Sequence, residues 1–294
     1  MIAKDSTPGT MGVEKLETHN EHEKDRKPRI IVNIPPVSRR HSPKFTSDSH
    51  RLTSARAFTS GSDTYHDVRP DYPPDILRLL RSARRVLDVG AGTGKFTQLL
   101  CESPRFDQVY ALDPSMDMLR TLVRFAPVPA WQATAEHTGC AAQLFDAVTC
   151  AQAWHWVDTK QASAELDRIT TRDAQVLLVW NTLDVTVPWV HRLSRIMHSG
   201  DMLTQGFLPS VYKPWIITDQ VHDRWEQELL PAQVHELTHT RSYWLRSNER
   251  IRARVTANLS WYLGEHLGYG ANDIVTLPYR LDGFVLSKIA QKLP

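Results

Sequence analysis

The stretch Val86-Leu87-Asp88-Val89-Gly90-Ala91-Gly92-Thr93-Gly94-Lys95 decides the fold of this chain. An apolar run ends in an acid, a turn with three glycines follows, and Phe96-Thr97-Gln98-Leu99-Leu100 begins a helix. A strand, a glycine turn and a helix in this order build a crevice at the carboxyl edge of the first strand of an open α/β sheet. The glycines let the backbone turn sharply and let a ligand lie against main-chain atoms. The stretch therefore predicts a nucleotide-sized binding site.

The spacing of the glycines separates three kinds of nucleotide site. A Walker A loop would need a glycine where Val89 stands and a serine or threonine where Phe96 stands. The dinucleotide fingerprint would need its third glycine at Lys95, which disfavours a nicotinamide oxidoreductase. The remaining pattern, Asp-x-Gly-x-Gly-x-Gly over residues 88–94, resembles motif I of the class I S-adenosylmethionine (AdoMet) methyltransferases.

Composition places the chain among soluble globular proteins and excludes several partners. Of its 294 residues, 41% are hydrophobic and 23% are charged, and the net charge of +2 gives no nucleic-acid signature. No apolar stretch approaches the roughly 20 residues of a membrane span, and the first residues lack the apolar region of a signal peptide. Cys101, Cys140 and Cys150 have no metal-ligand spacing. We therefore expect a cytoplasmic protein with free thiols, no metal, no membrane association and no nucleic-acid partner.

A change of composition divides the chain. Residues 1–57 are rich in charged residues, serine, threonine and proline, and they carry too little apolar surface to offset the entropy of ordering. We interpret them as a disordered N-terminal extension. By the resemblance of the glycine stretch, residues 58–294 would form a methyltransferase domain, with an AdoMet-binding core over about 84–182 and a substrate or lid part over about 183–294.

Alternating strand and helix patterns continue on both sides of the glycine turn. A helix is expected over 76–80, and short apolar strands are expected near 86–89, 108–112, 129–132, 145–150 and 174–180. This alternation predicts an α/β fold with a doubly wound, mostly parallel Rossmann-like sheet. Farther along, we expect a helix over 187–199, a strand over 235–244, a helix over 248–263 and a last strand over 273–277. Late strands would extend the sheet in antiparallel fashion, and the inserted helices would form a lid over its carboxyl edge.

An acid stands where a ribose-binding carboxylate is expected. Asp113 directly follows the strand at 108–112, and it comes after Gly94 by about the 20 residues typical of such a carboxylate. A carboxylate suits this task because it accepts hydrogen bonds from both hydroxyls of a cis-diol. Ser115 then suits the cap position of the next helix.

Further motifs follow one another as in the same family. They are Tyr65…Arg69-Pro70…Tyr72-Pro73, Leu112-Asp113-Pro114-Ser115…Met118-Leu119, Ala135-Glu136 and Ala151-Gln152-Ala153-Trp154-His155-Trp156. Together with the glycine stretch, this ordered set is similar to the type-11-like small-molecule group of class I methyltransferases, which also holds trans-aconitate-type enzymes. The likeness covers about residues 58–180, and two short matches near 189–190 and 277–280 extend it.

The resemblance implies a set of residues around AdoMet. The glycine loop would hold the methionine part, with Asp88 organising the loop and the ammonium end, and Asp113 would bind the ribose. Residues 115–116 and 135–136 would surround the adenine, residue 151 or 152 would lie near the amino group, and residues 65 and 69 would close over the cofactor. The residues so implied are Tyr65, Arg69, Asp88, Gly90, Ala91, Gly92, Asp113, Ser115, Met116, Ala135, Glu136, Ala151 and Gln152.

His155 is the candidate catalytic base. AdoMet carries an activated methyl group, so the protein must align a nucleophile with it and exclude water. A carboxylate acceptor needs no base, whereas a hydroxyl or ammonium acceptor is helped by one, and an imidazole titrates in the useful range. His155 follows the fourth strand between Trp154 and Trp156, and these three residues would form the substrate pocket. A pocket-shaping role alone is the alternative for His155.

Two functions remain open at this point. The first is AdoMet-dependent methyl transfer to a small-molecule acceptor, a carboxylate or a hydroxyl, by a monomer or weak homodimer. The alternative is a protein of the same fold that uses the cofactor site without methyl transfer, as a binding protein or a different catalyst. Asp88, the three glycines and Asp113 favour cofactor binding in both cases.

Overall fold

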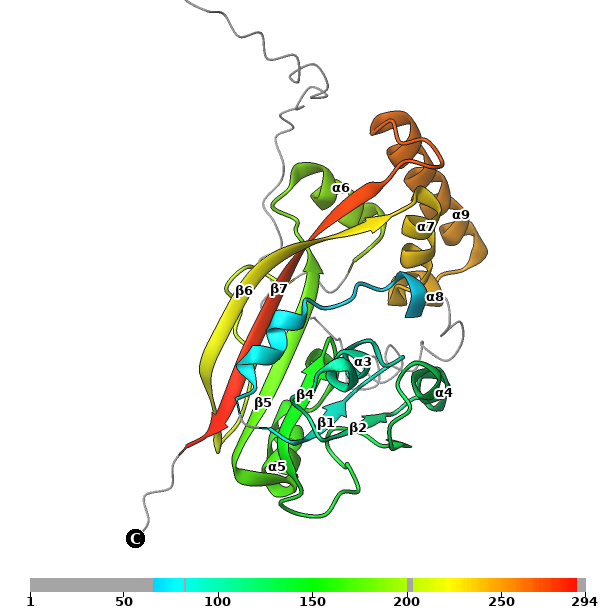
Figure 1. The fold of residues 1–294 in the computed structure, drawn as a ribbon. Coiled ribbons are helices and arrows are strands. Elements are labelled where there is room, and N and C mark those ends of the chain that lie inside the picture. Colours follow the sequence, from blue (N-terminus) through cyan, green and yellow to red (C-terminus); the bar gives the residue numbers. More distant parts are fainter. Residues whose placement is uncertain (1–65, 82, 200–202, 290–294) are drawn as a thin grey trace, which may run out of the picture. The chain divides into compact units, whose positions relative to one another are not determined.

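A computed structural model describes residues 66–81, 83–199 and 203–289. This part of the chain is built on a seven-stranded sheet with the order β3-β2-β1-β4-β5-β7-β6 (Figure 1). The extension predicted over 1–57 and the predicted site residue Tyr65 lie outside the described residues. The strands are β1 (Arg85–Val89), β2 (Gln108–Asp113), β3 (Ala130–Gln132), β4 (Phe145–Ala151), β5 (Thr170–Leu183), β6 (Trp215–Leu229) and β7 (Val275–Lys288).

The first five strands pair in parallel, as the sequence predicts. β1 lies between β2 and β4, β2 also pairs with β3, and β4 also pairs with β5. In β1, Val86, Leu87 and Val89 are at most 1% exposed, because helices cover both faces of a parallel sheet. The carboxyl ends of these strands therefore meet at one edge, where the glycine loop begins.

Helices cover the two faces of the parallel part. α3 (Lys95–Glu102) packs on the face that carries Val86, and α4 (Met116–Phe125) lies on the same face against Ala111. α5 (Thr159–Ile169) packs on the opposite face against Leu87, since successive strand residues point to opposite faces. This arrangement confirms the predicted doubly wound sheet. The elements are η1 (Pro74–Leu79), α3 (Lys95–Glu102), α4 (Met116–Phe125), η2 (Trp154–Trp156) and α5 (Thr159–Ile169).

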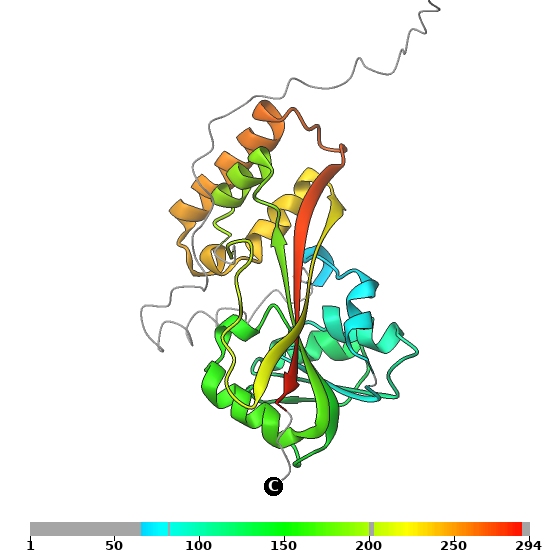
Figure 2. The same ribbon diagram turned by 90° about the vertical axis from the view of Figure 1, so that its left-hand side faces the viewer.

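Two long strands extend the sheet beyond β5. β7 runs antiparallel to both of its neighbours, β5 and β6 (Figure 2). The predicted last strand over 273–277 is too short, because β7 continues to Lys288 through the buried charged residues Arg280 and Asp282. The sequence did not predict β6. In this edge strand only Trp215 and Leu229 are buried, so it lacks the apolar alternation that marks a half-buried strand.

The helices that the sequence predicts as a lid, called the lid helices below, are gathered at one end of β5, β6 and β7, away from α5 (Figure 1). The predicted strand over 235–244 is wrong, because this stretch belongs to two helices, α7 (Pro231–His239) and α8 (Ser242–Arg246). Pro231 begins α7, as proline often does, and the fully buried Val234 and Leu237 share one helix face. Within the described ranges, no helix has the length and apolarity needed to span a membrane. The lid helices are α6 (Pro188–Ile196), α7 (Pro231–His239), α8 (Ser242–Arg246), α9 (Glu249–Ser260) and the π-helical η3 (Trp261–His266).

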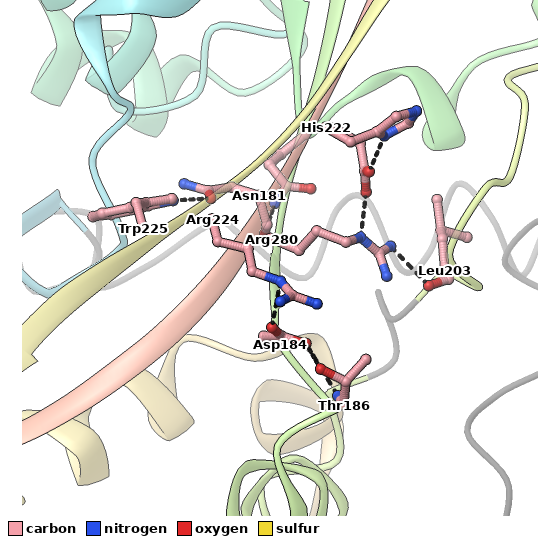
Figure 3. A network of polar contacts seen from close by, with 10 residues as sticks. Asn181, Asp184, Thr186, Leu203, His222, Arg224, Trp225 and Arg280 are labelled. Atoms are coloured by element: carbon pink, nitrogen blue, oxygen red, sulfur yellow. Dashed lines mark hydrogen bonds and ion pairs between the residues drawn. The ribbon is translucent and has the colours of Figure 1, made fainter.

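A buried polar network ties the long strands together (Figure 3). Asp282 is fully buried in β7, and its two oxygens accept hydrogen bonds from Arg280 Nε and His222 Nδ1, each at 2.7 Å. Arg280 also donates from Nη2 to the backbone oxygen of Leu203 at 3.0 Å. The network therefore connects β6, β7 and the segment that precedes β6, with the buried carboxylate paired to a guanidinium.

Candidate active site

A cavity of about 720 Å³ opens at the carboxyl edge of the parallel strands. Its walls are the glycine loop, the ends of β2 and β4, residues 132–136 and an arm that precedes η1. This volume lies within the roughly 300–1,000 Å³ of small-molecule and cofactor sites. The cavity brings together all the cofactor residues implied by the resemblance that lie in the described chain: Arg69, Asp88, Gly90, Ala91, Gly92, Asp113, Ser115, Met116, Ala135, Glu136, Ala151 and Gln152.

The glycine loop is shaped by hydrogen bonds to the end of β2. The amides of Gly90 and Ala91 donate to the backbone oxygen of Leu112 at 2.9 and 3.0 Å. Gly90 has φ of +69°, and a Cβ atom built on it would lie 2.5 Å from the Cβ of Ala153. Two features therefore require glycine at position 90: its backbone is left-handed, and the loop after β4 approaches it closely.

Replacing Gly90 by alanine is expected to lower the free energy of unfolding by about 2–4 kcal/mol, because left-handed strain and overpacking add. Gly92→Ala is the matched control. Gly92 also has positive φ, +57°, but nothing lies within 4 Å of the point that a Cβ atom would occupy, so only the backbone cost of about 1–2 kcal/mol applies. Equilibrium unfolding in urea measures both variants, and equal losses would contradict the role assigned to Ala153.

Asp88 lies under the loop and anchors it. Its side chain is 1% exposed, and its oxygens accept hydrogen bonds from Thr97 Oγ1 at 2.7 Å and Thr149 Oγ1 at 2.8 Å. Burial raises the pKa of Asp88 to about 7, since desolvation disfavours the charged form. Asp88 thus joins β1 to α3 and β4 directly beneath the cavity.

Asp113 stands at the end of β2 with its carboxylate against the loop. It accepts hydrogen bonds from the amides of Gly92 at 2.9 Å and Ser115 at 2.8 Å. Burial raises the pKa of Asp113 to about 6, although these two amides lower it. Each carboxylate oxygen has two acceptor sites, so the group retains capacity for a ligand hydroxyl. Ser115 caps α4 by accepting from the amide of Met118 at 3.4 Å.

The loop after β4 places only part of the predicted substrate pocket at the cavity. Trp156 lines the cavity, whereas Trp154 and His155 do not. Trp154 is 2% exposed, packs in the core and donates its indole N–H to the backbone oxygen of Ser210 at 3.0 Å. Nδ1 of His155 accepts the indole N–H of Trp180 at 3.3 Å. Of the three predicted pocket residues, therefore, Trp156 alone reaches the cavity.

Among the residues that the resemblance implies around the adenine, Glu136 also holds the loop after β4. Met116 is 44% exposed at the N-terminus of α4, and Ala135 is buried. Glu136 accepts a hydrogen bond from the amide of Asp158 at 2.7 Å. Because Glu136 makes this bond, it fixes the position of the loop as well as lining the cavity.

The arm over residues 66–73 covers the cavity and joins it to the lid helices. Arg69 lines the cavity and donates to Thr240 Oγ1 at 3.0 Å and to the backbone oxygen of Thr240 at 2.9 Å. Asp71 pairs with Lys95 at 2.7 Å, and its backbone oxygen accepts from Asn181 Nδ2 at 2.7 Å.

Sequence reasoning missed Lys95 and Asn181. Lys95 stands in the glycine stretch itself, but no local pattern marks Asn181, whose partners are distant in sequence.

The charges around the cavity favour a cationic ligand. Four acids and two bases line it, which leaves a negative excess when all are ionised. Two polar atoms of cavity-lining residues, Gln152 Oε1 and Thr93 Oγ1, are buried without a hydrogen-bond partner among the described residues. In the part of the chain that the structure describes, no three histidine, cysteine, aspartate or glutamate side chains lie together in a way that could hold a metal ion. The charged residues are Asp88, Asp113, Asp117, Glu136, Arg69 and Lys95.

Comparisons with known proteins identify the family. Residues 87–178 match the model of the family described as "Methyltransferase domain". An uncharacterized methyltransferase of Mycobacterium tuberculosis is 34% identical over 233 residues, which cover 78% of this chain and 94% of the relative. An uncharacterized methyltransferase-like protein of Schizosaccharomyces pombe is 32% identical over 150 residues, which cover 48% of this chain and 58% of that protein.

A solved structure supports the fold. It is that of a proposed type II methyltransferase from Anaeromyxobacter dehalogenans, with a TM-score of 0.56 and 22% identity over 75% of this chain and 97% of the other. The chain therefore belongs to the class I methyltransferase family, and it is an enzyme whose cofactor is AdoMet. The cavity fits such a ligand, since more acids than bases line it and it leaves a buried acceptor oxygen for an ammonium donor.

Proposed function

We propose that this enzyme transfers the AdoMet methyl group to a carboxylate of a small molecule. One observation carries the proposal: among the described residues that line the cavity there is no histidine, and each acid there already binds a group of the protein. Asp88 and Asp113 hold the loop, Glu136 holds the amide of Asp158, and Asp117 pairs with Arg120 at 2.9 Å. A carboxylate acceptor is ionised at neutral pH and needs no base. The sequence resemblance to the trans-aconitate-type group supports the same class.

His155 is not a catalytic base in this proposal, because its side chain does not line the cavity. The indole N–H of Trp180 can only donate, so Nδ1 of His155 accepts it and the proton of the neutral ring lies on Nε2. An imidazole in this tautomer presents a donor at Nε2. A hydroxyl acceptor would need a proton acceptor there.

We propose that the cofactor lies in the cavity as the resemblance implies. The activated methyl group on its sulfonium supplies the chemistry. The loop at 90–92 lies against the methionine part, Asp113 accepts from the ribose hydroxyls, and residues 115–116 and 135–136 surround the adenine. Arg69 and, by the resemblance, Tyr65 close the other end. Support comes from the single cavity that these described residues share and from its charge.

Asp113→Ala is expected to weaken AdoMet binding by about 1–3 kcal/mol, the scale of a lost hydrogen bond to a charged group. Calorimetric titration with AdoMet and S-adenosylhomocysteine measures the change. Asp117→Asn is the control, because Asp117 lines the same cavity but pairs with Arg120 on the surface. An unchanged affinity of Asp113→Ala for AdoMet would contradict the assignment of Asp113 to the ribose hydroxyls.

The acceptor class is tested with matched pairs of small acids and the corresponding primary alcohols. Radiolabelled methyl groups transferred to a carboxylate form esters, which release methanol in mild alkali, whereas methyl ethers do not. We expect transfer to acids and alkali-labile product. Label that stays bound in alkali would overturn the carboxylate assignment, and cofactor binding without transfer to either class would favour the non-methylating alternative.

We further propose that the enzyme acts in the cytoplasm as a monomer or weak homodimer. The outer strand β6 exposes charged side chains, including Asp223, Arg224 and Glu226, and such charges oppose edge-to-edge pairing of sheets. The free thiols Cys101, Cys140 and Cys150 suit a reducing compartment. Light scattering at micromolar concentration tests the oligomeric state.

A further inference from the structure

The arm over residues 66–73 forms one wall of the cavity, and its chain is stiff. Arg69, Pro70 and Tyr72 line the cavity. Pro70 and Pro73 have a backbone angle φ that their rings fix, and a residue that precedes a proline is restricted as well. Arg69 and Tyr72 both precede a proline. A contact that fixes one residue of this segment therefore also sets the position of its neighbours.

Asn181 in β5 holds the arm between two of these wall residues. Its Nδ2 donates to the backbone oxygen of Asp71 at 2.7 Å, and Asp71 stands between Pro70 and Tyr72. Asn181 is 2% exposed, so its side chain is shielded from water that would compete for this hydrogen bond. Asn181 does not itself line the cavity. The side chain of Asn181 therefore acts on the cavity through the arm.

The orientation of the Asn181 side chain is set from β6. The indole N–H of Trp225 can only donate, and it meets Asn181 Oδ1 at 2.7 Å (Figure 3). The ring of Trp225 stacks in turn on the ring of Tyr279, with 5.3 Å between the ring centroids. Because Oδ1 is bound to the indole, Nδ2 is the atom that faces the arm, and a backbone oxygen needs such a donor.

Two other contacts of the arm differ from this one. The carboxylate of Asp71 pairs with Lys95 at 2.7 Å, but the Asp71 side chain is 75% exposed, and exposed ion pairs contribute little to stability. Gln227 Nε2 donates to the backbone oxygen of Val68 at 3.3 Å, but Val68 does not line the cavity. Asn181 thus provides a buried contact in the part of the arm that forms the wall.

We propose that Asn181 is a positioning residue for methyl transfer. It holds the arm against the cavity, so that cofactor and acceptor stay aligned and shielded from water during the reaction. The same hydrogen bond slows the release of S-adenosylhomocysteine, because it keeps this wall of the cavity in place. Trp225 contributes from a distance by orienting Asn181. The effect on transfer rests on the proposed function, whereas the effect on release requires only that the cofactor occupies the cavity.

Two rate constants test this role. Enzyme loaded with radiolabelled S-adenosylhomocysteine is mixed with an excess of unlabelled compound, and rapid filtration follows the release of the label. Single-turnover transfer from AdoMet to a small acid that wild type methylates gives the second rate constant. Both rate constants describe folded molecules. A variant that only loses folded protein would therefore show smaller amplitudes with unchanged rate constants.

Two substitutions of Asn181 are expected to differ in size of effect. Asn181→Leu keeps the approximate volume and removes the hydrogen bond to the arm. It should speed the release of S-adenosylhomocysteine about 3- to 10-fold, the range for one net hydrogen bond, and should slow transfer by a similar factor. Asn181→Asp still accepts from Trp225, but its second oxygen faces the backbone oxygen of Asp71. Because two acceptors repel each other, both effects should be larger than in Asn181→Leu.

Gln227→Met is the matched control. It removes a hydrogen bond from a β6 side chain to the backbone of the same arm, but at Val68, which lies away from the wall. Both rate constants of this variant should stay close to those of wild type. If Asn181→Asp does not fold, the comparison of Asn181→Leu with Gln227→Met decides.

Release of S-adenosylhomocysteine at the wild-type rate in Asn181→Leu would overturn the inference. Equal changes in Asn181→Leu and Gln227→Met would also overturn it, because any lost contact of the arm would then have the same effect. Failure of the proposed function gives a different result: wild type would bind S-adenosylhomocysteine but transfer no methyl group to small acids. The release rates would still test the role of Asn181 in that case.

Discussion

Replacing Asp282 by alanine is expected to lower the free energy of unfolding by about 3–5 kcal/mol. Asp282 is fully buried, and its carboxylate is the partner of the buried guanidinium of Arg280 at 2.7 Å. Without it, Arg280 keeps its charge although it is only 6% exposed to water. The loss follows from the uncompensated charge, since the ion pair as a whole need not stabilise the fold.

Two further variants separate charge from shape in this network. Asp282→Asn keeps an acceptor for Arg280 but removes the negative charge, and it should cost about 1–3 kcal/mol. His222→Ala removes the other partner of Asp282. Because the His222 side chain is 38% exposed, water can replace its hydrogen bond to Asp282. Equilibrium unfolding in urea at neutral pH measures all three. A loss below about 1 kcal/mol for Asp282→Ala would show that Arg280 finds another partner or reaches water.

The affinity for AdoMet is expected to fall about 100-fold between pH 8 and pH 5 through Asp88 alone. Its pKa of about 7 in the free protein means that it is protonated at pH 5, while a cationic ligand favours the ionised form. Below pH 7, binding must then release a proton, which costs about a factor of ten per pH unit. Asp113, with a pKa of about 6, acts in the same direction.

The stability of the free protein should change with pH in the opposite sense. Because both carboxyl groups have folded pKa values above the usual value of 3.8, the stability they contribute is complete below pH 4. It is lost as the pH rises toward 7. The increase in melting temperature on adding AdoMet should therefore be larger at pH 8 than at pH 5.

Calorimetry in buffers of different ionisation enthalpy counts the protons released on binding. Asp88→Asn is the control, because the asparagine side chain does not titrate. In this variant the affinity for AdoMet should change less with pH at the higher end of the pH range. An affinity that stays constant from pH 5 to pH 8 in wild type would contradict the coupling. Such a result would mean that Asp88 keeps one protonation state with and without the cofactor.

The parallel part of the sheet and the position of the cavity could be predicted from the sequence. The reason is that their signals are local. The apolar run before Gly90 and the turn after it specify a strand, a loop and a helix, and parallel topology brings the next strand ends to the same edge. The twelve described residues named from motifs therefore meet at one cavity, although their contacts with AdoMet stay a prediction.

The sequence by itself thus determined the methyltransferase family, the parallel part of the sheet and the edge of the sheet at which the cavity opens. Only the tertiary structure decided the rest, because it depends on partners far apart in the chain. β6 is a strand because it pairs with β7 at the sheet edge. Trp154 packs among core side chains, and the backbone oxygen of the distant Ser210 accepts its indole N–H. Asn181 joins the arm at Asp71 to Trp225 in β6. Contacts of this kind leave no periodic or spacing signal, since each forms only when distant elements have packed together.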